Sequence, residues 1–162
     1  MKIVIDSSPI IFLLRLSTLE LFLNTNNDEF YITPSVVTEI NAKSDEVSRA
    51  LNPILAAEKL IVQSTNLTSL FNRLNVSFGR GESETIALAM ELQADFVILD
   101  DLAARNMASN LGLNVKGTLA ILKKLAVEEK IEIGNKDEFY QNLVKIKFRI
   151  SRSIFDAVFS DV

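Results

Sequence analysis

Six acidic residues of this 162-residue chain are candidates for a shared reactive site. They are Asp6, Glu39, Glu82, Glu84, Asp100 and Asp101. The chain has no His and no Cys. This excludes a Ser-His-Asp triad, an imidazole base and zinc held by thiolate or imidazole. Crowded carboxylates repel one another, and a divalent cation with oxygen ligands relieves that repulsion. A Mg²⁺ or Mn²⁺ ion held by such acids can bind a phosphodiester and lower the pKa of an attacking water.

Short apolar runs between helical segments predict the scaffold that positions these acids. The predicted strands are Lys2–Ile5, Glu29–Ile32, Leu60–Gln63, Phe96–Leu99 and Asn114–Lys116. Their alternation with helices indicates βαβ units and a mostly parallel sheet covered on both faces, a three-layer α/β/α fold. Ligands of such sheets collect at the carboxyl ends of the strands. Asp6 and Asp100 each end a predicted strand, so we expect both at one rim of the sheet.

Helix signals fill the intervals between these strands. Ser8 is predicted to cap a helix that has Pro9 at its first position. Ser77–Gly81 is expected to be a loop rich in helix breakers, and Asp101 and Gly112 are expected to bound one helix. The other predicted helices are Thr18–Leu23, Pro34 through Ile40, Ser48–Lys59, Leu67–Leu74, Glu82–Gln93, Leu102–Leu111, Gly117-Thr118 to Glu128, and two in the tail. We therefore expect one domain over 1–162, with a helical C-terminal tail from about 136.

Spacing limits which acids can share a site. Glu82 and Glu84 are two positions apart on a helix and do not face the same way. Asp100 and Asp101 diverge if the strand continues through both. For Glu84 the structural interpretation, a favourable charge at a helix N-terminus, outranks the ligand role. Asp101 is the better N-cap and Asp100 the better ligand.

Asp6 and Glu39 also have structural interpretations. Asp6 could have a purely structural role, as a cap or turn residue where its strand ends. Glu39 could be a solvated helix residue. The predicted common rim is what favours a functional role for both acids.

Charge and hydropathy constrain the partners. The net charge is −4, the pI is about 4.9 and the mean hydropathy is +0.23. Residues 116–162 hold nine Lys and Arg against seven acids, a net +2, whereas residues 1–115 hold eight against fourteen, a net −6. A phosphate-facing surface is therefore more plausible in the last third. The basic residues there are Lys116, Lys145, Lys147, Arg149 and Arg152, with surface solvation as their default role.

No apolar run is long enough to span a bilayer, since about 18–20 residues are needed. An Asp at position 6 comes too early for a signal peptide. We expect a cytoplasmic protein with no membrane contact.

The order of these motifs resembles the PIN-domain family. The residues that carry the resemblance are Met1–Asp6 with Ser7-Ser8, Pro34–Ile40 with Glu39, Gly81-Glu82-Ser83-Glu84 before Ala87-Leu88-Ala89, Ile98–Asp101, Gly117-Thr118-Leu119 and Phe148–Ser151. They cover nearly the whole chain in the family's order. They look closest to a prokaryotic branch that includes toxins of toxin–antitoxin pairs. The resemblance implies a Rossmann-like sheet and a Mg²⁺- or Mn²⁺-dependent endoribonuclease.

The same resemblance implies roles for individual residues. Asp6, Glu39, Glu82 and Asp100 match the family's four catalytic, metal-binding acids. Ser8 matches a small polar position that orients ligands or phosphate, and Glu84 and Asp101 remain secondary candidates. The third acid is Glu where the family more often has Asp, so Glu84 could share or take that role. Expected partners are RNA, a cognate antitoxin and a second copy of the chain in a homodimer.

Two other functions would also use parts of this pattern. A phosphorylated receiver-like switch also uses an acidic rim, but it needs the paired acids after its first strand, whereas here the lone Asp6 comes first and Asp100-Asp101 later. A catalytically silent PIN-like module would bind RNA or a protein without cleavage. Gly79-Arg80-Gly81 fits no phosphate-loop pattern, although Arg80 near the rim could contact RNA.

Overall fold

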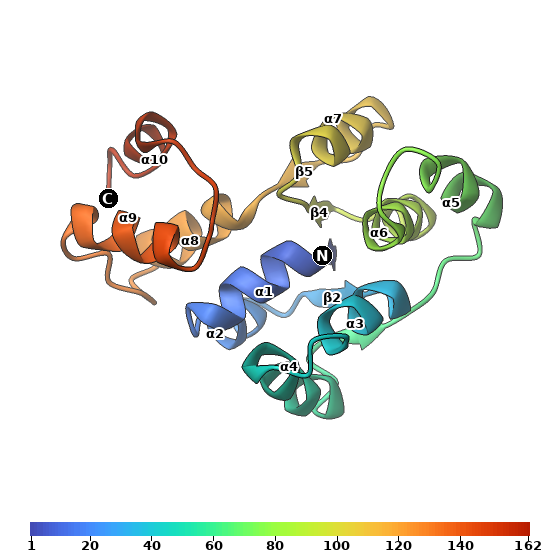
Figure 1. Cartoon of the computed structure of the whole chain (residues 1–162), viewed down its shortest axis with the longest axis horizontal. Helices are drawn as coiled ribbons and strands as arrows, with labels where there is room; N and C mark the ends of the chain where they lie inside the picture. The colour runs from blue at the N-terminus through green and yellow to red at the C-terminus, as the bar shows by residue number, and fades with distance from the viewer.

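The computed structural model describes residues 1–162 and contains one sheet of five parallel strands (Figure 1). The strands are β1 (Lys2–Ile5), β2 (Glu29–Ile32), β3 (Ile61–Val62), β4 (Phe96–Ile98) and β5 (Val115–Lys116). Their order is β3-β2-β1-β4-β5, and each neighbouring pair is parallel. The order reverses between β1 and β4, and ligands of such sheets bind at this reversal. The predicted α/β fold is confirmed.

Ten helices connect or follow the strands. They are α1 (Ser7–Arg15), α2 (Leu19–Leu23), α3 (Pro34–Asn41), α4 (Glu46–Ala56), α5 (Thr68–Leu74), α6 (Arg80–Glu91), α7 (Leu102–Asn110), α8 (Thr118–Val127), α9 (Lys136–Lys145) and α10 (Arg152–Val158). Thr33 caps α3 through its side chain, and Pro34 takes the first position, as predicted. Gly112, at φ +87°, follows the end of α7, in the left-handed conformation that favours glycine there.

Three helices begin two residues before their predicted first residue. Helix α1 begins at Ser7 with Asp6 as its N-cap, so Ser8 is not the cap. Helix α4 begins earlier because the Asp45 carboxylate accepts hydrogen bonds from the N–H groups of Val47 and Ser48, both at 3.1 Å. Helix α6 begins at Arg80 with Gly79 as the N-cap. In each case the prediction began the helix at the first residue of clear helical character. The capping residue lies three positions earlier, and the helix begins directly after it.

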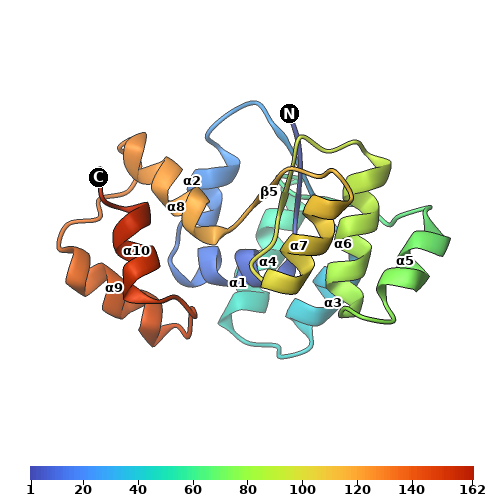
Figure 2. The same cartoon turned by 90° about the horizontal axis from the view of Figure 1, so that it is seen from above.

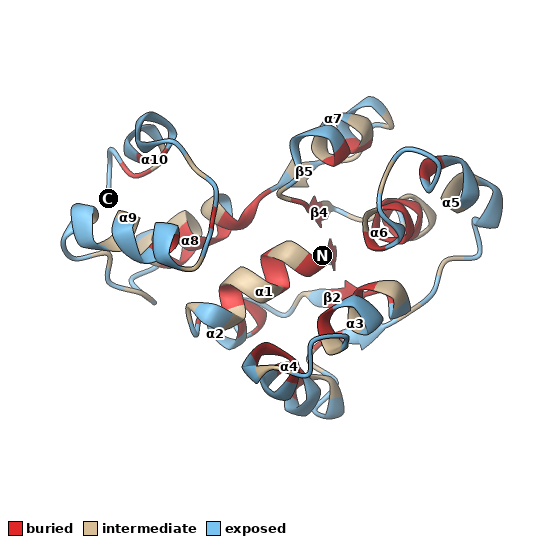
Figure 3. Ribbon diagram, in the orientation of Figure 1, coloured by how far each residue is buried: buried red, intermediate tan, exposed pale blue.

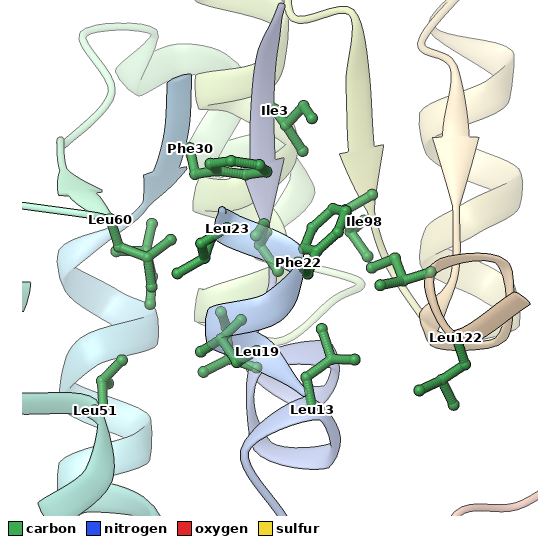
Figure 4. Packing of buried hydrophobic residues seen from close by; sticks show 14 of the residues in the cluster. Ile3, Leu13, Leu19, Phe22, Leu23, Phe30, Leu51, Leu60, Ile98 and Leu122 are labelled. Carbon is green, nitrogen blue, oxygen red and sulfur yellow. The ribbon is translucent and has the colours of Figure 1, made fainter. Parts of the chain in front are cut away.

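The side chains of each strand alternate between two cores, as the period of a strand requires. In β1, Ile3 and Ile5 belong to the larger hydrophobic cluster, whereas Val4 belongs to the smaller one. Figure 4 shows the larger cluster, where Phe22 and neighbouring side chains of α2 pack over the sheet. Figure 3 shows the buried residues concentrated on the strands and the inward faces of the helices. Burial on both faces holds the carboxyl ends of β1 and β4 side by side.

The last three helices form one end of the molecule (Figure 2). Phe155 and Phe159 of the tail are fully buried, and the Phe148 ring packs edge-on against Phe12 of α1 at 4.8 Å between centroids. Arg152 forms ion pairs with two acids of the tail, so this member of the basic tail is engaged within the chain. No helix has the length and apolar character that a membrane span requires.

Candidate metal centre

Asp6 lies at the carboxyl end of β1, next to β4. Its backbone N–H donates to the Ile98 carbonyl at 3.1 Å, which ties the residue to the neighbouring strand. The residue is only 3% exposed. Its Oδ1 atom has one side-chain donor, the Thr85 hydroxyl at 3.5 Å, a long and weak hydrogen bond. The carboxylate is thus buried with little to compensate its charge.

Burial raises the pKa of Asp6 from its ordinary value of 3.8 to about 7. A hydrogen bond from the Ser7 backbone opposes this shift, and the carboxylates of Glu82, Glu39 and Asp100 add to it. These are the other three acids that the sequence analysis placed at the rim. The structure therefore brings all four acids into one electrostatic environment, in which a proton or a cation on Asp6 is favoured.

Asp100 follows β4 and is held by Thr118 at the start of α8. The Thr118 N–H donates to Oδ1 at 2.8 Å, and its hydroxyl donates to Oδ2 at 2.6 Å. Burial raises the pKa of Asp100, whereas the two Thr118 hydrogen bonds and the positive charge of Arg105 oppose the rise. Thr118 therefore fixes the orientation of this carboxylate and favours its ionised form.

We predict that Thr118→Val weakens this control. The variant keeps the side-chain volume and the backbone donor but loses the hydroxyl donor, so the pKa of Asp100 should rise. A hydrogen bond to a charged group contributes about 1.5–3 kcal/mol, and the free energy of unfolding at pH 8 should fall by that amount in urea denaturation. Thr118→Ser is the control, since it retains the hydroxyl. Equal stability of the Val and Ser variants would contradict the prediction.

Glu39 approaches Asp6 across the backbone of Gly81. The Glu39 side chain is exposed and forms no hydrogen bond or ion pair within the chain. A Cβ atom on Gly81 would lie 2.6 Å from Glu39 Oε2 and 3.8 Å from Asp6 Oδ1. Glycine at position 81 therefore leaves open the space between these two carboxylates.

Gly81→Ala should push the Glu39 carboxylate away from Asp6 and weaken Mn²⁺ binding several-fold in a calorimetric titration. The Glu39 side chain is flexible and can move, so the fold should survive. Gly79→Ala is the matched control, because a Cβ at that position has no neighbour within 4 Å. Unchanged Mn²⁺ affinity in the Gly81 variant would show that this approach has no part in metal binding.

Glu82 lies in the first turn of α6 and is half-buried. Burial raises its pKa, the carboxylates of Asp101 and Glu39 add to the rise, and a hydrogen bond from the Gly79 backbone opposes it. That hydrogen bond resembles the reach of a capping box back to the N-cap. Glu82 thus stabilises the start of α6 and also lies near the other acids of the rim, Asp101 and Glu39.

Glu84 and Asp101 have structural partners. Asp101 Oδ2 accepts from the Ala104 N–H at 2.9 Å, so the predicted N-cap of α7 is confirmed. Glu84 is buried, and its Oε2 accepts from the Ser35 N–H at 3.0 Å. The charge was predicted to favour the start of its own helix, but it stabilises the start of α3 instead. Of the two helix acids, Glu82 is therefore the one that raises the pKa of Asp6.

No three of these carboxylates converge on one point at coordinating distance. Asp6 and Asp100 are held by the fold, whereas Glu39 and Glu82 have longer, more exposed side chains that can rotate. The available donors are carboxylate oxygens with nearby hydroxyls, and no nitrogen or sulfur ligand. This donor set fits a Mg²⁺ or Mn²⁺ ion, which prefers oxygen ligands and keeps several waters.

Arg105 is a residue of this site that the sequence analysis missed. It lies on α7, half-buried, and its Nη1 atom donates to the Leu99 carbonyl at 3.3 Å. It also stands close enough to Asp100 to lower the pKa of that carboxyl. Its spacing of four residues after Asp101 was the available signal, because this places it one helical turn into the helix that begins at the rim.

The sequence profile of the family described as DUF3368: PIN domain matches residues 2–162. The chain belongs to the PIN-domain family. No curated protein matches the chain. Among solved structures, this PIN domain is similar to a PilT N-terminus domain protein from the hyperthermophilic archaeon Sulfolobus solfataricus P2. The identity is 24% and the TM-score 0.53, over 76% of this chain and 92% of that one, a likeness of fold.

PIN domains are generally nucleases, and PIN-domain nucleases generally use divalent metals. In this PIN domain the four acids Asp6, Glu39, Glu82 and Asp100 lie at the rim where the strand order reverses. Ser8, half-buried in the first turn of α1, lies close in sequence to Asp6 and forms no side-chain hydrogen bond within the chain.

Proposed function

We propose that this PIN domain is a divalent-metal-dependent endoribonuclease that hydrolyses RNA phosphodiester bonds. One observation carries the proposal. The Asp6 carboxylate is buried at the strand-order reversal, and burial together with Glu82, Glu39 and Asp100 raises its pKa to about 7. Such a group is unfavourable as a free anion near neutral pH, and a bound cation would remove the penalty.

The residues divide the work in this proposal. Asp6 and Asp100 would hold Mg²⁺ or Mn²⁺ from fixed positions, and Glu39 and Glu82 would complete the site after rotation of their side chains. The bound ion would supply a polarised phosphate and a water of lowered pKa. If its carboxylate stays free of the ion, Glu82 would accept the proton of the attacking water. Ser8 and Thr118 remain beside the two fixed carboxylates to orient ligands.

The test is cleavage of a 5′-labelled single-stranded RNA in the presence of Mn²⁺ or Mg²⁺. Wild type should cleave, and EDTA or Asp6→Asn should abolish cleavage. The matched control is Asp95→Asn. Asp95 precedes β4, and its carboxylate accepts from the Lys2 N–H at 2.7 Å, at the amino ends of the strands and so opposite the rim. This variant should cleave normally.

Cleavage that persists in EDTA and in Asp6→Asn would overturn the metal-dependent mechanism. RNA binding by wild type without any cleavage would favour the silent PIN-like module instead.

We further propose that the protein is the toxin of a toxin–antitoxin pair and that it acts as a homodimer. The resemblance to a toxin-like branch supports this role. Its partner would then be an antitoxin protein that blocks the acidic rim. Expression in a bacterial host should arrest growth, and Asp6→Asn should relieve the arrest. Equal toxicity of wild type and variant would count against the role.

A further inference from the structure

The Arg105 guanidinium occupies the space that a side chain at position 117 would fill. A Cβ atom built on Gly117 would lie 2.4 Å from Arg105 Nη1, 3.1 Å from Asp100 Oδ1 and 3.5 Å from the Leu99 carbonyl oxygen. Gly117 is buried and has φ −121°, a backbone angle open to any residue. Glycine therefore leaves this space open, and the group that uses the space is a cation beside a candidate metal ligand. A larger residue at position 117 would have to displace the flexible end of the Arg105 side chain.

Most of the donors of this guanidinium have no partner in the chain. Arginine has five N–H donors, and the single protein acceptor of Arg105 is the Leu99 carbonyl. Arg105 belongs to none of the ion pairs of the chain. A half-buried guanidinium with free donors at the edge of a site for a divalent ion is suited to bind a phosphate oxygen, often through two parallel hydrogen bonds.

We propose that Arg105 binds a backbone phosphate of the RNA strand, on the Asp100 side of the acidic rim, and that Gly117 keeps the space for it. This inference rests on the proposed function. Arg105 places a positive charge at this rim of a protein whose net charge is −4. Direct phosphate contacts position the strand without reading its bases.

A purely structural role predicts different behaviour, and the chain offers a matched residue for the comparison. Arg15 lies at the end of α1, away from the rim, and its Nη1 atom donates to the Ile146 carbonyl at 3.3 Å. It therefore has the same single bond to a backbone carbonyl, at the same length, as Arg105. Arg15 is exposed whereas Arg105 is half-buried, so the comparison concerns RNA binding. If Arg105 only holds Leu99, Arg105→Met and Arg15→Met should both leave RNA binding unchanged.

The experiment measures binding of a fluorescein-labelled single-stranded RNA by anisotropy over a range of salt concentrations. Ca²⁺ replaces Mn²⁺, and an uncleaved probe on a gel confirms that the affinities refer to intact RNA. Arg105→Met should weaken binding roughly 10- to 100-fold, as loss of a charge-assisted hydrogen bond does. It should also reduce the slope of log K against log salt by about 0.7, the value for one phosphate contact of a single strand. Arg105→Lys should recover part of the affinity, and Arg15→Met should bind as wild type.

A second variant tests the space at position 117. Gly117→Ala should displace the guanidinium and weaken RNA binding in the same direction, whereas Gly79→Ala should not, since its Cβ would meet nothing within 4 Å. Thermal unfolding of each variant verifies that it is folded.

The outcomes separate this inference from the proposed function, because binding is measured without cleavage. Wild-type affinity and salt slope in Arg105→Met would overturn the phosphate contact, even if the wild type cleaves RNA with Mn²⁺. Loss of affinity in a protein that never cleaves would support the contact and overturn the nuclease. Absence of RNA binding by wild type would overturn both.

Discussion

Asp6→Asn is expected to make the metal-free protein more stable at pH 8 while it abolishes cleavage. The pKa of Asp6 is raised from 3.8 to about 7 in the folded protein, so the folded state binds this proton more tightly than the unfolded chain. The free energy of unfolding therefore falls as pH rises from about 4 to about 7, while Asp6 loses its proton. Above pH 7 the full cost of the buried charge remains. Asparagine carries no charge and avoids the penalty.

The size of the effect follows from the shift. Each pKa unit corresponds to 1.36 kcal/mol, so the shift of about three units amounts to up to about 4 kcal/mol at pH 8 and to roughly 1.5 kcal/mol at pH 5. The stability gain of the variant should therefore grow with pH.

Urea denaturation in EDTA at pH 5 and pH 8 measures this difference. Asp95→Asn is the control, since it removes a carboxylate that has a backbone donor, and it should show no such gain at pH 8. A wild type that is as stable as Asp6→Asn at pH 8 without metal would contradict the electrostatic crowding of the rim.

Mn²⁺ is expected to stabilise the wild type strongly and in a pH-dependent way. The metal competes with the proton on Asp6, so the apparent affinity should rise up to tenfold per pH unit below about 7 and level off above it. At a concentration of 100 times the dissociation constant, the ligand stabilises by about 2.7 kcal/mol. For a chain of this length that corresponds to roughly 5–10 °C in Tm.

Thermal unfolding with and without Mn²⁺ at pH 5.5, 7 and 8 tests this expectation. Asp6→Asn should lose the response. Glu84→Gln should keep it, because Glu84 holds the start of α3 through Ser35. A response that is independent of pH, or that survives in Asp6→Asn, would place the metal elsewhere.

The sequence was sufficient to predict the sheet and the rim. Each strand is a short apolar run next to a helix signal, and parallel topology then requires that Asp6 and Asp100 end on the same side. The N-cap role of Asp101 was also predictable, since the residue directly precedes a helical segment. Both predictions depend on local pattern and on rules of topology.

The misplaced or missed features depend on contacts distant in the sequence. Glu84 stabilises α3 because α6 packs against it, and a separation of 49 positions between Glu84 and Ser35 gives no local signal for that contact. Arg105 lies over Gly117 only because α7 and the turn after β5 meet at the rim. A lone Arg on a helix and a lone Gly before a helix have many explanations until the tertiary structure puts them together.

The most direct test of the acidic rim as a metal centre is a crystal soaked in Mn²⁺ and measured for anomalous scattering. A manganese peak should lie in contact with the carboxylates of Asp6 and Asp100 and within reach of Glu39 or Glu82, but not of Glu84. A crystal with Mn²⁺ bound only elsewhere, or with Asp6 still unliganded at a saturating concentration, would contradict the nuclease mechanism proposed for this protein.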